Sequence, residues 1–486
     1  MCHEHIERND TFMGVHDIFN MLIKWTVPVI LFMTACLALF LICYKLFYQK
    51  LLLGKRKISW PRFILVILLL GYLFLVFVIT TLSRGGNYSG QINLNLISGY
   101  LDVWNSWSST SFLLLVYNIA MLMPLGFMLP LISLKFRTWK AALFSALIYT
   151  TFIEVFQLIS HRGIFELDDL VHNIIGAIAG YLIIKIFLDY KNEKKFRKST
   201  MIKDAIIPMF YVCLFGGAIL AYNLQEFGNM SIRPSQGTDI SGVSISCEVD
   251  LTKNRSEVPI YYNVNANQPK RAFNIISVLQ RTINLPQIHR IGNNGENKQY
   301  EFLRDDNVTS SLIYFKGDGT WWLSDDNTAD IDSKATDADT RNKIEKMLKE
   351  NSFIPANAIL ECDQNGTFRW DASAVDPTRM KKDFLNGMVM VDVTASGKIS
   401  MLHYGLTENK YVRQVQTISP MEAFKKVMNG EFDSYRPYVS GDKIKITEMQ
   451  MRYMYDSKGY YQPVYEFTGS LNSEEGACNI MIPALP

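Results

Sequence analysis

Polar side chains are set into apolar segments between residues 118 and 181, and this placement constrains the chain more than any other feature. The region contains NIAMLMPLGFMLP, then IYTTFIEVFQLISHRG, then ELDDLVHNIIGAIAGY. A carboxylate or an amide inside hydrocarbon is costly unless it has a partner or a functional purpose. Glu154, Gln157, Asp169 and Asn173 are therefore the first candidates for a functional site.

The apolar segments are long enough to cross a hydrocarbon core, which takes roughly 20 helical residues. They lie near 26–48, 62–82, 111–132, 140–160, 168–188 and 203–223. The expected fold class is a membrane all-α bundle of about six transmembrane helices plus a soluble extracellular α+β domain. Its expected parts are an extracellular N-terminal segment (1–25), a transmembrane region (26–223) and the extracellular domain (224–486), which is long enough for two subdomains.

Basic residues predict the orientation in the membrane. They cluster in three alternate loops, near 45–62, 135–140 and 185–203, whereas the loops 83–110 and 161–167 hold few. The positive-inside rule places the three basic loops in the cytoplasm. We therefore expect a multi-pass plasma-membrane protein whose N-terminus and C-terminal domain lie outside. The net charge of only +3 gives no reason to expect a nucleic-acid partner.

The C-terminal half shows the patterns of an α+β domain. LIYFKGDGTWWL (312–323) predicts a hairpin around a Gly-Asp-Gly turn, and ADTRNKIEKMLKEN (338–351) predicts an amphipathic helix. Strands are expected within 387–406 and 443–469, with a helix at 419–430 between them. An earlier strand at 258–263, followed by a helix, fits the same order. We expect antiparallel strands with helices packed on them.

Neither the cysteines nor the acidic residues form a metal-binding pattern. The seven cysteines show no Cys/His ligand spacing, and the sequence leaves open whether Cys247, Cys362 or Cys478 pair. The acidic stretch 325–340 fails the calcium-loop template, because the sixth and twelfth positions counted from residue 330 hold Ala335 and Arg341. No metal and no cofactor are expected.

Helix rise and the predicted orientation place the polar groups in the outer leaflet. At ~1.5 Å per residue, Asn118 lies on the order of 10 Å below the outer end of the third span, and Glu154 lies ~9 Å below the outer end of the fourth. Gln157 lies above Glu154, Asp169 at the interface and Asn173 about 6–8 Å deeper. The sequence therefore predicts a polar, outward-open pocket among three helices.

Neighbouring residues support this pocket. Asp169, Asn173, Gly176 and Gly180 follow one helical stripe, and the two glycines form a GxxxG pattern that permits close helix approach. Pro124, with Gly126 nearby, interrupts the third span and frees backbone carbonyls. Arg162, in the loop after the fourth span, is placed to neutralise Glu154 or Asp169. Buried polar groups can also simply bond helices together, and this alternative stays open.

These residues resemble the signature of the VanZ-like family over roughly residues 60–190. In that family a serine often precedes the glutamate, where this chain has Thr150 and Thr151. The resemblance implies an integral membrane protein acting at the outer cell envelope, since the family's namesake is associated with teicoplanin resistance in Gram-positive bacteria. The matching positions are Asn118, Pro124, Gly126, Glu154, Gln157, Arg162, Asp168, Asp169, Asn173, Gly176 and Gly180.

Three functions are compatible with the sequence. The first is a non-catalytic protein whose pocket binds membrane lipids, a lipid-linked cell-wall precursor or the acyl tail of a lipoglycopeptide, and so lowers teicoplanin susceptibility. The second is an enzyme that modifies a lipid-linked envelope substrate through Glu154 or Asp169, although the chain has no nucleophile elbow and no HExxH motif. The third is a sensor or adaptor whose domain 224–486 binds an extracellular protein or peptide.

Overall fold

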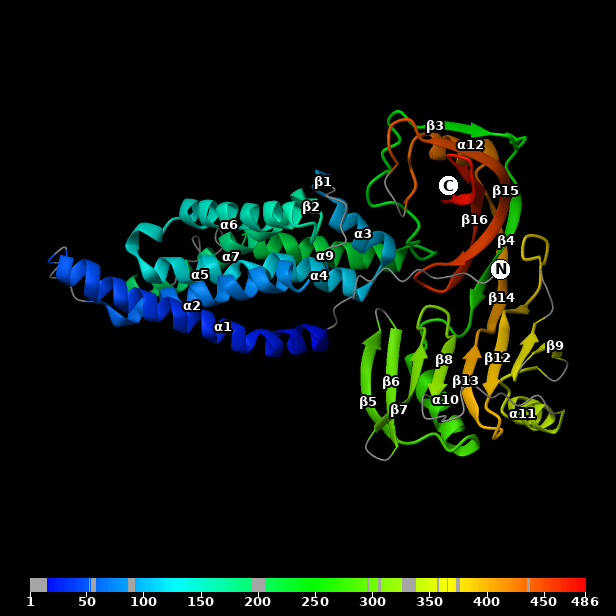
Figure 1. The fold of residues 1–486 in the computed structure, drawn as a ribbon. Coiled ribbons are helices and arrows are strands. Elements are labelled where there is room, and N and C mark those ends of the chain that lie inside the picture. Colours follow the sequence, from blue (N-terminus) through cyan, green and yellow to red (C-terminus); the bar gives the residue numbers. More distant parts are fainter. Residues whose placement is uncertain are drawn as a thin grey trace. The chain divides into compact units, whose positions relative to one another are not determined.

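The computed structural model describes residues 15–51, 53, 58–85, 92–193, 206–294, 297–304, 307–325, 338–355, 358–364, 366–372, 376–434 and 438–486 (Figure 1). The chain forms two compact units. One contains the helices up to Leu224, and the other contains Gln225–Pro486 together with Trp104–Ser108. Each unit is described by itself.

Apolar helices build the first unit. Five stretches are long and apolar enough to cross a membrane: Ile23–Leu51, Trp60–Leu82, Ser109–Ile132, Trp139–Ile159 and Leu167–Lys191. These stretches make the chain a multi-pass membrane protein. Of the sixth predicted span, residues 203–205 lie outside the described residues, and the remainder is the apolar helix α9 (Ile206–Leu224).

Two of the five stretches contain a wider π-helical turn, and a third is interrupted. α1 (Val15–Cys43) continues as the π-helix η1 (Tyr44–Leu51), and α2 (Trp60–Phe77) continues as η2 (Val78–Leu82). The third stretch is divided into α4 (Ser109–Met121) and α5 (Met123–Ile132). The other two are α6 (Trp139–Ile159) and α7 (Leu167–Glu193). π-Helical turns occur frequently at functional sites.

The division between α4 and α5 follows from Pro124. Proline has no N–H to donate within the helix, so the carbonyl of Ala120, four residues earlier, loses its usual partner. The hydroxyl of Tyr72 in α2 donates to the neighbouring carbonyl of Met121 at 2.7 Å and so supports the chain beside the break. Leu122, at the break itself, is fully buried in the core of the bundle. The sequence had indicated that neighbouring helices would have to satisfy freed carbonyls here.

Short elements connect the long helices at both ends of the bundle. β1 (Ile92–Asn93) pairs in parallel with β2 (Phe165–Glu166), which lies in the connection between α6 and α7. α3 (Ser98–Ser106) follows β1. A single 3₁₀ turn, η3 (Leu134–Phe136), connects α5 to α6. The segments before α3 and before α7 are therefore held together by backbone pairing.

An eight-stranded antiparallel sheet forms one part of the second unit, and α10 (Pro269–Thr282) and α11 (Ala338–Glu350) pack against its core. Tyr314 pairs with Trp321 across the predicted Gly-Asp-Gly hairpin, which confirms that prediction. The predicted helix at 338–351 is also confirmed. In spatial order the strands are β5 (Ile288–Asn294), β6 (Asn297–Arg304), β7 (Asn307–Tyr314), β8 (Trp321–Asp325), β13 (Ile399–Tyr404), β12 (Met388–Val393), β10 (Thr367–Asp371) and β9 (Ile359–Gln364).

A seven-stranded sheet forms the other part and has a separate apolar core with α12 (Pro420–Met428). α12 begins with a reciprocal capping box between Ser419 and Glu422. Six strands follow one order: β11 (Phe384–Asn386), β14 (Thr407–Gln416), β4 (Glu257–Asn263), β16 (Tyr460–Leu471), β15 (Lys443–Tyr455) and β3 (Ser244–Cys247). The seventh strand, β17 (Glu474–Pro483), pairs with β16.

The expected fold class, a membrane all-α bundle plus an α+β domain, is confirmed. The sequence had allowed for two subdomains, but it did not indicate which strands form each sheet, because the sequence patterns locate strands without assigning them to sheets. Cys247 and Cys478 are free thiols, and the side chain of Cys362 lies outside the described residues. Most of the acidic stretch 325–340 also lies outside the described residues.

Candidate functional site

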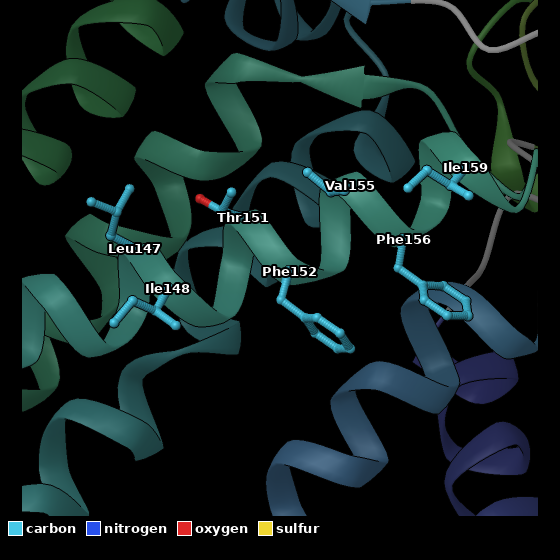
Figure 2. A pocket seen from close by; sticks show the side chains of 7 residues that line it. All are labelled: Leu147, Ile148, Thr151, Phe152, Val155, Phe156 and Ile159. Atoms are coloured by element: carbon cyan, nitrogen blue, oxygen red, sulfur yellow. The ribbon is translucent and has the colours of Figure 1, made fainter.

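α6 presents two chemically different faces. Thr150, Glu154 and Gln157 lie on its inner face, where each side chain is at most 3% exposed. Thr138 caps the start of the helix by accepting a hydrogen bond from the backbone N–H of Ala141. The outer face is apolar and carries an open hollow of about 590 Å³ (Figure 2). Its lining residues, all on α6, are Leu147, Ile148, Thr151, Phe152, Val155, Phe156 and Ile159.

The start of α7 is tied to the start of α3 by Asp168. Its carboxylate accepts hydrogen bonds from the hydroxyl of Ser98 at 3.1 Å and from the backbone N–H of Gly99 at 2.9 Å. The second oxygen accepts the backbone N–H of Asp169 at 2.9 Å. Asn93 in turn donates to the Ser98 hydroxyl at 3.0 Å. A carboxylate that accepts backbone N–H groups at a helix start is a stabilising arrangement.

α7 also bonds to α4 and α6 through its polar stripe. The side-chain amide of Asn118 donates to Asp169 at 2.5 Å, and that of Asn173 donates to the hydroxyl of Thr150 at 3.0 Å. The two predicted site residues Asn118 and Asp169 are thus brought into direct contact. Thr150, which the sequence analysis noted only as a departure from the family pattern, is a partner in this network.

The predicted glycines lie where backbones touch. A Cβ on Gly176 would lie 1.7 Å from the carbonyl oxygen of Ile119, and a Cβ on Gly180 would lie 2.0 Å from that of Met123. A Cβ on Gly126 would lie 1.8 Å from the carbonyl oxygen of Ala177. No larger residue fits these contacts without separating the helices. The spacing had indicated this packing role for the GxxxG pair.

Glu154 and Gln157 bond to backbone groups of other segments. Glu154 accepts the backbone N–H of Glu166 at 3.1 Å, and Gln157 donates to the carbonyl of Thr80 in η2 at 2.8 Å. Arg162 donates to the carbonyls of Leu82 and Arg84, both at 2.9 Å. The sequence had suggested that Arg162 neutralises Glu154 or Asp169, but its hydrogen bonds go to these carbonyls instead.

Arg84 supplies the positive charge that the sequence analysis had attributed to Arg162. Its electrostatic attraction acts on Glu154, Glu166 and Asp169, and its side chain is exposed. It was overlooked because it is the lone basic residue in the loop 83–110, where the low basic content was used only to assign orientation. Its position as the lone basic residue of this loop was the signal that could have identified it.

Glu166 lies outside the five membrane-spanning stretches and joins the acidic group. Burial raises the pKa of its carboxyl above the usual range, and the neighbouring charge of Asp168 raises it further. A hydrogen bond with Asn93 and the charge of Arg84 act in the opposite direction. The site therefore brings together four carboxyl groups, those of Glu154, Glu166, Asp168 and Asp169.

These contacts correct the predicted depths. Asn118 was placed on the order of 10 Å below the membrane surface and Asp169 at the surface, yet the two bond directly. The contact between Glu154 and the backbone of Glu166 leads to the same correction. It places the start of α7 at the depth of Glu154 and not at the depth of the end of α6. The connection 160–166 therefore folds back along α6. Asp168 holds the start of α3 beside this connection.

His172 is a further polar residue of the site that the sequence analysis missed. Its side chain is 1% exposed, and its ring meets the ring of Tyr100 edge-on at a centroid distance of 5.0 Å. The spacing of four residues from Asp168 was the available signal, since such residues share a helix face. Among the described residues, no group of three or more histidine, cysteine, aspartate or glutamate side chains is arranged to hold a metal ion.

Residues 63–188 match the protein-family model described as VanZ/LLP1. This match confirms the resemblance to VanZ-like proteins for the part of the chain that contains every predicted site residue. No curated protein matches the chain.

Two solved structures are similar to large parts of the chain. An uncharacterized protein from Eubacterium rectale ATCC 33656 shares 11% identity, covers 50% of this chain and 87% of its own, and has a TM-score of 0.23. The Bacillus megaterium YpeB C-terminal domain shares 14% identity, covers 46% of this chain and 100% of its own, and has a TM-score of 0.20. At these TM-scores, neither likeness supports a conclusion about fold or function.

Proposed function

We propose that the VanZ/LLP1-like segment binds a lipid-linked cell-wall precursor or the acyl-bearing part of a lipoglycopeptide at the outer leaflet of a Gram-positive plasma membrane. Binding lowers the susceptibility of the cell to teicoplanin. The observation that carries the proposal is the convergence of polar groups from three apolar helices, above all the buried Glu154 of α6 and the half-buried pair of Asp169 of α7 and Asn118 of α4. Ionisable groups in such helices are costly, and this cost favours a functional role.

Orientation supports a site open to the outer leaflet. The basic residues Lys135, Arg137 and Lys140 follow α5 and begin α6, so the positive-inside rule assigns that end of the bundle to the cytoplasm. Glu154 and Asp169 lie toward the opposite ends of their helices. In this orientation the site faces the leaflet in which cell-wall precursors and glycopeptides meet.

The outer face of α6 supports a ligand with a hydrocarbon tail. The hollow there is lined by apolar side chains except for the hydroxyl of Thr151 (Figure 2). Ile148 and Ile159 on this face are 72% and 74% exposed, so an acyl or prenyl chain has direct access. Such a chain would lie along the same helix that carries Glu154 on its inner face.

The test is antibiotic susceptibility in a sensitive Gram-positive host that expresses the chain. We expect the wild type to protect against teicoplanin, which carries an acyl chain, and not against vancomycin, which carries none. Glu154→Gln and Asp169→Asn should abolish this protection at matched membrane levels. Asp189→Asn provides the control, because it removes a carboxylate near the far end of α7. A well-expressed wild type that gives no protection would contradict the proposal.

A further inference from the structure

The acidic group sets four carboxyl groups beside one another. Glu154, Glu166, Asp168 and Asp169 are close enough to act electrostatically on one another, and the opposing charge that acts on three of them comes from the exposed Arg84. Interactions between like charges strengthen in a low-dielectric interior. Each ionised carboxyl of this group would repel an anionic phosphate placed beside it.

The hydrogen-bond donors that the structure shows in this region already donate to acceptors of the protein itself. Asn118 donates to Asp169, and both Ser98 and the backbone of Gly99 donate to Asp168. A phosphate needs several donors or cations around it, as helix starts and arginine side chains provide elsewhere. The group therefore has acceptors to offer a ligand, and its visible donors are committed.

Two buried polar atoms on adjacent residues of α7 have no hydrogen-bond partner among the described residues. They are Nδ1 of His172 and Oδ1 of Asn173, on side chains that are 1% and 2% exposed. A buried polar atom without a partner costs free energy, on the order of 1–3 kcal/mol. A bound group that supplies the missing hydrogen bonds would recover this free energy.

His172 lies beside the carboxylate of Asp168. The Cβ position of Gly99 is 2.9 Å from an Asp168 oxygen and 3.9 Å from Cε1 of His172, so both groups border the same glycine. The ring of Tyr100 packs edge-on against the imidazole ring of His172. Carboxylate and amide oxygens accept hydrogen bonds, and a neutral imidazole also has one acceptor nitrogen.

We propose that the ligand is held by a head group that donates hydrogen bonds, an ammonium or a hydroxyl group, and that His172 and Asn173 contact this group directly. A phosphate of the ligand, where present, stays outside the acidic group. This inference rests on the proposed function, since it names the chemistry that the same site recognises. It also explains why two buried polar atoms without partners lie next to the acidic group.

The test compares three probes that share a dodecyl chain: dodecylammonium, dodecyl maltoside and dodecyl phosphate. Binding to the full-length protein is measured by native mass spectrometry in an uncharged polyoxyethylene detergent. We expect dodecylammonium or dodecyl maltoside to bind about tenfold more tightly than dodecyl phosphate, in keeping with one or two satisfied hydrogen bonds. Preference for the first identifies an amine as the donor, and preference for the second identifies a sugar.

Two variants localise the effect. His172→Phe keeps a planar ring and Asn173→Leu keeps the volume, and each should reduce binding of the preferred probe about tenfold while leaving dodecyl phosphate unchanged. Asp189→Asn should bind all three probes like the wild type. Thermal unfolding in the same detergent confirms that each variant is folded.

Dodecyl phosphate binding as tightly as the other probes, or no probe binding specifically, would overturn the inference. The proposed function is judged separately by teicoplanin susceptibility. If the wild type protects and Glu154→Gln does not, while dodecyl phosphate binds best, the proposed function stands and the inference about the head group is wrong.

Discussion

The carbonyl oxygen of Ile119 lies only 1.7 Å from the position that a Cβ on Gly176 would occupy. The oxygen belongs to the backbone and the position of a Cβ is fixed by the backbone, so no side-chain rotation relieves the overlap. Gly176→Ala should therefore lower the stability of the helical unit by about 1–3 kcal/mol or more, as overpacking does. Thermal unfolding in detergent measures the loss. Gly216→Ala is the matched control, because a Cβ there meets nothing within 4 Å.

The hydrogen bond between Asn118 and Asp169 predicts the behaviour of a swapped pair. Asn118→Leu removes the donor and should cost on the order of 1 kcal/mol, because a half-buried carboxylate oxygen loses its partner. The double variant Asn118→Asp with Asp169→Asn should regain most of this stability, since donor and acceptor have exchanged places. Unfolding of all three proteins under identical conditions checks the pairing. A double variant less stable than Asn118→Leu would contradict it.

Glu166 predicts how stability changes with pH. The pKa of its carboxyl is raised above its ordinary value of 4.5 in the folded chain. Below that value the group is neutral in both states, so its stabilising contribution is fully present. As pH rises, the Glu166 carboxyl ionises first in the unfolded chain. Its stabilising contribution is therefore lost as the pH increases from 4.5 to the raised pKa of the folded chain. Glu166→Gln should flatten this decline in melting temperature between acidic and neutral pH. An unchanged pH profile would exclude Glu166 as its source.

The capping box of α12 predicts a local effect in the second unit. The Ser419 hydroxyl accepts the backbone N–H of Glu422 at 3.2 Å, and the Glu422 carboxylate accepts the N–H of Ser419 at 2.7 Å. Ser419→Ala should destabilise the helix by about 1 kcal/mol. Hydrogen exchange of amides in Pro420–Met428 should accelerate, while exchange in Pro269–Thr282 serves as the internal reference.

The orientation assigned from basic residues predicts which positions are accessible from outside the cell. Lys253→Cys, in the second unit, should react with a membrane-impermeant maleimide on intact cells. Lys135→Cys, between α5 and α6, should react only after permeabilisation. Both side chains are exposed, so a difference in labelling reflects the side of the membrane and not burial. The background protein should carry serine in place of all seven native cysteines. The opposite labelling pattern would reverse the proposed topology.

Much of the fold could be predicted from the sequence because its periodicities are local. Apolar length identified the long helices, and the Gly-Asp-Gly turn identified the hairpin that joins β7 to β8. The polar positions in the bundle were also identifiable, since polar residues in apolar helices stand out. Local patterns do not report which strands share a sheet, so the sequence allowed for two subdomains without assigning the strands to them.

The partners within the site depend on long-range geometry. Asn118 and Asp169 were both identified, but their contact was hidden by the assumption that every helix ends at the membrane surface. The backbone contact between Glu154 and Glu166 places the start of α7 well below the end of α6. Arg84 and His172 were missed because their roles arise only when α2, α3 and α7 come together.

The folded-back connection between α6 and α7 has a consequence for the comparison of relatives. Glu154 bonds to the backbone of Glu166, and β2 pairs with β1 directly before α7 begins. These two contacts fix the path of the connection and therefore the number of residues between Glu154 and Asp168. A relative that keeps both carboxylates has to keep this spacing, and its insertions should fall before β1 instead. In an alignment, a length change after the glutamate would then separate proteins that retain this site from those that have lost it.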